Sequence, residues 1–167
     1  MLKIRHAKTD DVDKISDIEQ KCFPPAEAAG RAAIERRVKA FPSHFWLLFD
    51  CAEDGKERGL VSFINGMTTN ERNLTDEMYE NESLHDENGK WQMIFGVDTN
   101  PAFQHKGYAS RLMEQVVSDC KESGRRGIVL TCKEKLRGFY ERFGFVCEGV
   151  SSSVHGGAVW LQMRLEF

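Results

Sequence analysis

Residues 104–109 have the residue types of an anion-binding turn: Gln104, His105, Lys106, Gly107, Tyr108 and Ala109. They lie between a predicted strand, 91–99, and a predicted helix that runs to about residue 122. Such a turn directs several backbone N–H groups to one point at the positive end of a helix dipole, which suits a pyrophosphate. Gly107 would let a phosphate approach the backbone. Taken alone, the segment fits a solvated tight turn equally well.

The elements that must position this turn can also be predicted. The helix after the turn carries an apolar face formed by Ala109, Leu112, Met113, Val116, Val117 and Cys120. This spacing is typical of an amphipathic helix. Residues 127–132 are apolar and predict a buried strand, and a second helix is expected at 135–143, ending before Gly144. The predicted order is strand, turn, helix, strand, helix, strand.

Two motifs together resemble the GNAT superfamily of N-acetyltransferases. One is Gln-x-x-Gly-x-Ala at 104–109, and the other is the run FYERFGF at 139–145. Residues 132–145 and 60–66 are most similar to the arylalkylamine (serotonin) N-acetyltransferase branch. The resemblance implies an α/β (α+β) fold with a mixed, mostly antiparallel central sheet of six to seven strands and about four helices. It also implies one domain, 1–167, with a polar acidic insertion at about 68–90.

The resemblance further implies acetyl-CoA as co-substrate, with its diphosphate held by residues 104–109. In this family the pantetheine arm pairs with the strand before the turn, which corresponds here to Val97 and Thr99. A backbone N–H near Val97 would polarise the acetyl carbonyl, and such a donor typically lowers a barrier by about 3 kcal/mol. Gly96 within this strand predicts a bulge or the close approach of another backbone, although a plain irregularity would fit as well.

Tyr140 matches the family tyrosine that assists the leaving thiolate. A phenol stays protonated at neutral pH and can donate a hydrogen bond, but a tyrosine packed in the core would fit the pattern too. The base is harder to assign, because arylalkylamine enzymes carry His-x-His where this chain has residues 93–95 (MIF). Asp98 is a candidate that could organise a water molecule, or it could be a strand-end turn residue. His44 and His155 are further candidates that fit structural roles better.

The acceptor pocket is expected near Phe23 and Pro24, by resemblance, and near Met93 and Phe95, which would make it more apolar. These residues favour a small amine, aromatic amines included. The acidic segment 68–90 predicts either a solvated surface or an electronegative lip for a cationic amine or a protein amine. The sequence leaves these substrates open.

Composition excludes several other classes of protein. The net charge of −3 argues against general nucleic-acid binding, and there is no signal peptide or membrane-length apolar run. Five scattered cysteines predict reduced thiols in the cytoplasm, and the histidines lack the ligand spacing of a metal site. We therefore expect a cytoplasmic N-acetyltransferase that needs no metal and uses direct attack by a primary amine. The alternatives are a CoA-binding sensor or assembly module and a protein amine acetyltransferase, and open sheet edges are compatible with a homodimer.

Overall fold

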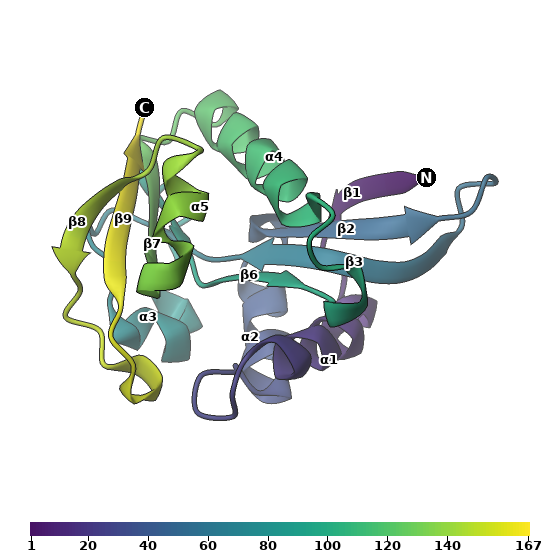
Figure 1. Ribbon diagram of the computed structural model, residues 1–167, viewed down its shortest axis with the longest axis horizontal. Helices are drawn as coiled ribbons and strands as arrows, with labels where there is room; N and C mark the ends of the chain where they lie inside the picture. Colours follow the sequence, from purple (N-terminus) through teal and green to yellow (C-terminus); the bar gives the residue numbers. More distant parts are fainter. The chain divides into compact units, whose positions relative to one another are not determined.

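The computed structural model describes residues 1–167 (Figure 1). The chain folds into two compact units. The first unit contains Met1–Asn65 and Gly96–Val116. The second unit contains Gly66–Phe95 and Val117–Phe167.

The first unit is built on a four-stranded antiparallel sheet with the order β1-β2-β3-β6. Its strands are β1 (Leu2–His6), β2 (Phe45–Cys51), β3 (Glu57–Asn65) and β6 (Gly96–Thr99). Its helices are α1 (Val12–Cys22) and α2 (Arg31–Ala40), followed along the chain by the start of α4 (Tyr108–Glu122). Helix α1 packs against α2 and against β3 and β6 (Figure 1).

Helix α1 has a buried face at the spacing expected for an amphipathic helix. Val12, Ile15 and Ile18 are buried there, as the sequence predicts. The helix is preceded by a single 3-10 turn in which the Asp11 carboxylate accepts the Lys8 N–H, at 2.7 Å. This bond closes the 3-10 turn, and Asp11 then stands at the N-cap position of α1 without a side-chain hydrogen bond to that helix.

The segment 26–40, rich in alanine and arginine, predicts a short helix, but α2 begins only at Arg31. The N–H groups of Glu27 and Ala28 both donate to the Pro24 carbonyl, which makes a separate turn after the two prolines. Gly30, in an extended conformation, then caps the helix. The connection between α1 and α2 is consequently a loop with its own hydrogen bonds.

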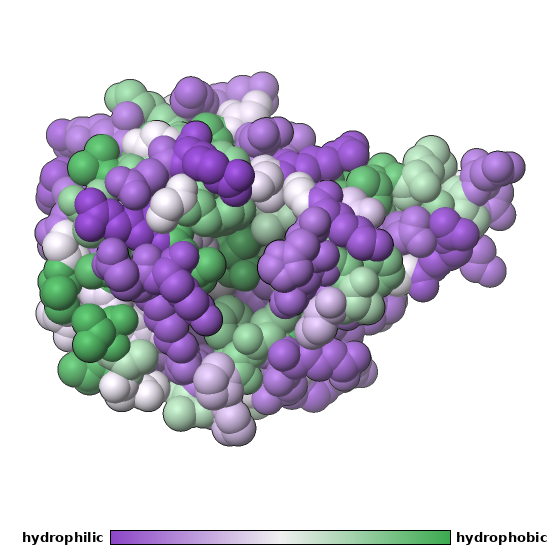
Figure 2. All heavy atoms as spheres, in the orientation of Figure 1, coloured by the Kyte–Doolittle hydropathy of each residue, from purple (hydrophilic) through white to green (hydrophobic).

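Strands β2 and β3 form the predicted antiparallel hairpin around the polar turn at 53–56. Figure 2 shows hydrophilic atoms at its tip, at the right of the view. The base of the hairpin is apolar and buried, with Phe45, Leu47 and Phe63 fully enclosed. Buried side chains thus fix the register of the strands that carry the site.

The second unit is built on a five-stranded sheet with the order β4-β5-β7-β9-β8. Its strands are β4 (Thr68–Thr69), β5 (Trp91–Ile94), β7 (Gly127–Cys132), β8 (Val146–Val150) and β9 (Leu161–Glu166), and its short helices are α3 (Asp76–Glu80) and α5 (Arg137–Glu141). Only β5 and β7 pair in parallel. Helix α4, which begins in the first unit, ends in this one.

The acidic insertion has internal structure. The predicted short helix after Thr75 is present as α3 and buries Met78, whereas Leu84 is exposed. Asp76 accepts hydrogen bonds from the Ser153 hydroxyl and the Val154 N–H, so part of the segment holds the loop before β9.

The mixed α/β, mostly antiparallel fold class is confirmed, and four details differ from the prediction. There are nine strands in two sheets and five α-helices. The single strand expected at 91–99 is divided at Phe95 into β5 and β6, which belong to different sheets. The irregularity expected at Gly96 therefore corresponds to the point where the chain passes from one sheet to the other. The alternation of apolar and polar residues at 159–165 predicts a strand with Arg164 on its polar face, but Arg164 is buried. Helix α5 is also shorter than expected, because a 3-10 turn occupies Glu134–Leu136. No helix of the chain combines the length and the apolar character needed to cross a membrane.

Candidate active site

The turn between β6 and α4 keeps its amide groups available. The Asn100 side chain accepts the Ala102 N–H and stabilises a 3-10 turn, Pro101–Phe103. Hydrogen bonds of the main chain resume only when the Arg111 N–H donates to Gly107. The amides of residues 104–109 therefore have no acceptor within the protein, which is the arrangement an anion needs.

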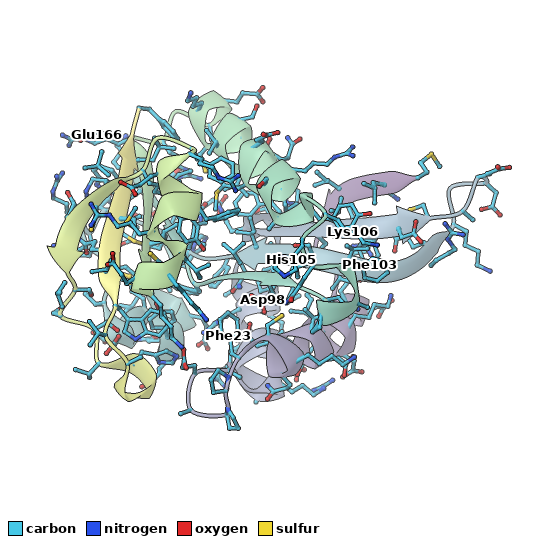
Figure 3. The ribbon with its side chains drawn as sticks, in the orientation of Figure 1. Phe23, Asp98, Phe103, His105, Lys106 and Glu166 are labelled. Atoms are coloured by element: carbon cyan, nitrogen blue, oxygen red, sulfur yellow. The ribbon has the colours of Figure 1, made fainter.

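Two positive backbone angles shape this turn. His105 has φ 63° and Gly107 has φ 81°, and both residues are exposed. Successive residues that change between right-handed and left-handed conformations turn their N–H groups to the same side and form an anion-binding nest. Figure 3 shows His105 and Lys106 in this loop, beside Phe103. The Lys106 ammonium lies 5.9 Å from the centre of the Phe103 ring and adds positive charge to the turn.

Strand β6 is the edge strand of the first unit's sheet. The Asn100 N–H donates to the Val61 carbonyl at 2.8 Å. Hydrogen-bonded pairs alternate along an antiparallel ladder, so Asp98 also directs its backbone groups towards β3. Val97 and Thr99 direct theirs to the other edge of β6, where an extended ligand could pair with both N–H groups and with the Val97 carbonyl, while the Thr99 carbonyl accepts the Cys22 thiol.

Asp98 occupies an unusual environment for a carboxylate. Its side chain is fully buried, and neither carboxylate oxygen accepts a hydrogen bond from an N–H or O–H group. Burial raises its pKa well above the ordinary value, and the charge of Glu19 and a hydrogen bond with Glu19 raise it further. The role considered for Asp98 from the sequence, organising a water molecule near the acetyl group, stays a prediction.

Glu19 is the residue that sequence reasoning missed. It is buried on α1, and its Oε2 atom accepts the Ala29 N–H at 2.9 Å. A signal was present, because Glu19 stands four residues after Ile15 and so belongs to the apolar face of the helix. An acidic residue at such a position has to find a partner in the interior.

The expected acceptor residues of the first unit lie at the end of α1. Phe23 is half-buried and ends the helix in an extended conformation, and Pro24 is exposed. The Cys22 thiol donates to the Thr99 carbonyl at 3.1 Å, which fixes the end of α1 beside β6. The structure thus brings the predicted acceptor loop and the predicted acyl strand together (Figure 3).

The remaining candidates belong to the second unit. Tyr140 is buried on α5, with its ring edge-on to Phe139 and Phe145. Met93 is fully buried in β5, whereas Phe95 is half-buried and lies 4.9 Å from the Tyr79 ring. Of these two, Phe95 has surface to offer to a ligand.

The two histidines considered as bases have structural surroundings. His44 is buried in the first unit, with its ring edge-on to Trp46. His155, in the second unit, stacks on Tyr79 with ring centres 5.0 Å apart.

Comparison with known proteins identifies the class. The sequence profile of the acetyltransferase (GNAT) family matches residues 12–145. Serotonin N-acetyltransferase from Mesocricetus auratus is 26% identical over 160 residues, covering 87% of this chain and 76% of that protein. The crystal structure of the loading GNATL domain of CurA from Lyngbya majuscula aligns with a TM-score of 0.81 at 18% identity, covering 99% of this chain and 98% of that one. A GNAT family acetyltransferase from Brucella melitensis, in complex with acetyl-CoA, aligns with a TM-score of 0.60 at 19% identity, covering 100% and 88%.

The chain belongs to the GNAT family of acyl-CoA-dependent acetyltransferases. The resemblance seen in the motifs at 104–109 and 139–145 is confirmed, and the match to serotonin N-acetyltransferase agrees with the similarity noted at 132–145 and 60–66.

Proposed function

We propose that this protein transfers the acetyl group of acetyl-CoA to a primary amine by direct attack, without a covalent enzyme intermediate. The observation that carries this proposal is the row of unpaired amides at 104–109, directly after the open edge of β6. The diphosphate of CoA would accept hydrogen bonds from these amides, and its pantetheine arm would pair with Val97 and Thr99. The N–H of Val97 would polarise the acetyl carbonyl.

For the acceptor we propose a small amine, aromatic amines included. Phe23 and Pro24 at the end of α1 support an apolar contact. Phe95, in the second unit, has a partly exposed ring that supports the same substrate class, whereas Met93 is fully buried and offers no surface of its own. The similarity to serotonin N-acetyltransferase supports the same class. A protein amine and a CoA sensor without turnover are the competing functions, and an assay with a panel of amines separates them.

We further propose a single catalytic domain that works in the cytoplasm, as a monomer or a homodimer. The family match from residue 12 to residue 145 includes parts of both units, which supports one domain. All five cysteines are free, which supports a reducing compartment.

The proposed diphosphate site at 104–109 is tested with Gly107→Glu and its control, Gly107→Ala. A side chain at Gly107 would meet no atom within 4 Å, so both variants should fold, with a cost of about 1–2 kcal/mol for the left-handed conformation. The glutamate brings a negative charge to the diphosphate site, and we expect calorimetry to show no CoA binding. The alanine variant should bind CoA measurably. Unchanged CoA affinity in Gly107→Glu would reject the site.

Turnover is tested by release of free thiol from acetyl-CoA with the amine panel and with peptides. Release with small amines supports the proposed function, and release with peptides alone supports the protein acetyltransferase. Tight CoA binding without any release would support the sensor.

Tyr140→Phe tests the proposed role of Tyr140 as hydrogen-bond donor to the leaving thiolate. Since only the hydroxyl is lost, we expect kcat to fall about 10²-fold or more while the Kd of acetyl-CoA changes little. Phe139→Leu, which alters a neighbouring ring and leaves the hydroxyl, is the control. Equal turnover of Tyr140→Phe and the parent enzyme across pH would remove Tyr140 from this role.

A further inference from the structure

Three polar side chains from different elements converge on Gly96. A Cβ atom at this position would lie 2.9 Å from Asp98 Oδ1, 3.6 Å from Asn65 Nδ2 and 3.8 Å from Glu19 Oε1. Arg37, on α2, donates from Nη1 to Asn65 Oδ1 at 3.3 Å and so orients the Asn65 amide. The absence of a side chain at Gly96 is what leaves room for this cluster in the first unit.

The cluster contains two carboxyl groups and too few donors for both to be ionised. Asp98 receives no hydrogen bond from an N–H or O–H group, and Glu19 receives one, from Ala29 N–H. An ionised carboxylate that is buried without donors is very costly. A carboxyl group that donates its own proton to a neighbouring carboxylate avoids this cost, as in other carboxyl pairs that share one proton.

Most of the surroundings of Asp98 raise its pKa. Burial has the largest effect and raises its pKa; the negative charge of Glu19, a hydrogen bond with Glu19 and the Cys22 thiol raise it further. Arg37 opposes them and lowers the pKa. The net effect is a pKa of Asp98 raised well above its ordinary value, which favours the protonated form of Asp98 beside Glu19.

The two carboxyl groups differ in access and position. Glu19 keeps an exposed fraction of 6%, whereas Asp98 has none, so a ligand can reach the pair only through Glu19. Glu19 lies one turn before the end of α1, and its bond to Ala29 ties it to the connection that contains the proposed acceptor residues Phe23 and Pro24. Asp98 directly follows Val97, the proposed donor to the acetyl carbonyl. The pair therefore lies between the two places where the reactants are expected.

We infer that Glu19 and Asp98 hold one proton between them and that Glu19 is the base that takes the proton from the ammonium form of the acceptor. Asp98 is a positioning residue, and Asn65 with Arg37 fixes the cluster from β3 and α2. This inference rests on the proposed function and assigns the base that His-x-His supplies in related enzymes.

The step balances without any further reactant. The ammonium group gives one proton to the pair, which changes from one proton to two and becomes neutral, and the amine is left with its lone pair. The nitrogen then attacks the thioester carbonyl; the C–N bond forms and the C–S bond breaks. The second amine proton goes to the thiolate through Tyr140 or water, and the pair finally releases its extra proton to solvent.

The test measures kcat/KM against pH for the parent, Glu19→Gln and Asp17→Asn. Asp17 is an exposed carboxylate on the same helix and serves as the control. With an alkylamine of pKa about 10.4, only about one molecule in 2,500 is neutral at pH 7. We expect Glu19→Gln to lose about 10²-fold or more at pH 7 and to approach the parent as the pH nears the pKa of the amine. Asp17→Asn should match the parent throughout.

An acceptor that is already neutral sharpens this test. With an amine whose pKa lies below the assay pH, no base is needed, so Glu19→Gln should act almost as fast as the parent. A loss by the same factor at every pH and with both amines would mean that Glu19 is only structural, and the inference would be wrong.

The shared proton is read independently of turnover by infrared spectroscopy of the protein without ligands. We expect the carbonyl stretch of a protonated carboxyl group near neutral pH, absent from Asp98→Asn and retained in Asp17→Asn. No such band would overturn the inference even if acetylation is found. A band together with no reaction of any amine would instead reject the proposed function and, with it, the role of Glu19 as base, while the shared proton would stand.

Discussion

Asp11 and Asp98 are two aspartates of the same unit, both almost completely buried, and their surroundings are opposite. Asp11 receives two hydrogen bonds from the Arg5 guanidinium, at 2.8 and 2.9 Å, and one from the Lys8 N–H. Burial disfavours its charge, but the hydrogen bonds from Arg5 and Lys8 prevail and lower its pKa. Asp98 has no such donor, and its pKa is raised.

The difference separates a carboxylate that stabilises the fold from one for which we propose a functional role. Arg5 also binds Glu57 and lies 4.3 Å from the centre of the Phe49 ring, so the charge of Asp11 fastens the start of α1 to the sheet. Such a satisfied network stabilises the fold. A buried carboxyl group that lacks donors contributes nothing comparable to stability, and groups with strongly shifted pKa values are concentrated at functional sites.

The largest expected effect is on the free energy of unfolding when each aspartate is replaced in turn by asparagine. Asp11→Asn should lower the free energy of unfolding by about 3 kcal/mol, because it leaves Arg5 without its buried partner. Asp98→Asn should change it by less than about 1 kcal/mol below pH about 3.9 and should raise it near neutral pH, because the parent must bind a proton on folding that the amide does not need. Urea denaturation of the two variants measures both values. Equal destabilisation of the two variants would show that the two aspartates do not differ in their contribution to stability, and the distinction between them would be wrong.

The two aspartates should also give opposite dependences of stability on pH. The pKa of Asp11 is lowered on folding, so its contribution is present above the unfolded value of about 3.9 and is lost as the pH falls through its native pKa. The pKa of Asp98 is raised, so the native state binds the extra proton. The parent should therefore lose stability relative to Asp98→Asn as the pH rises from about 3.9 to the native pKa.

Denaturation curves at several pH values measure these slopes, which cannot exceed about 1.4 kcal/mol per pH unit for one proton. Subtracting the curve of each Asn variant from that of the parent isolates the aspartate concerned. A difference for Asp98 that rises with pH would contradict the assignment of its proton.

The smallest expected effect on stability comes from Gly96→Ala. Its methyl group would lie 2.9 Å from Asp98 Oδ1, and the carboxyl group can move aside by rotation. We expect a change in unfolding free energy of less than about 1 kcal/mol but a measurable shift in the pH dependence of acetylation. Gly59→Ala is the control, since a Cβ there would meet no atom within 4 Å in the same sheet. An unchanged pH profile in Gly96→Ala would show that the carboxyl pair tolerates displacement.

Local pattern was sufficient to predict the turn at 104–109 and the helix after it. The reason is that a strand, a glycine-containing turn and an amphipathic helix are all determined by neighbours in the sequence. The paired strands of the hairpin were predictable for the same reason. The same local pattern placed Arg164 at the surface, because alternation does not reveal the partners Glu148 and Asn73 that satisfy the buried guanidinium.

The sequence alone determined the family, the glycine-containing turn at 104–109 that we propose for the diphosphate, and the presence of Asp98 in the strand before it. Only the tertiary structure placed Glu19 next to Asp98, because α1 and β6 are far apart in the chain and meet through the packing of the first unit. The tertiary structure also decided that the pKa of Asp11 is lowered and that of Asp98 is raised, since each shift depends on the donors that folding brings within hydrogen-bonding distance. A carboxylate has the same identity in both places, but its charge state is set by its neighbours in space.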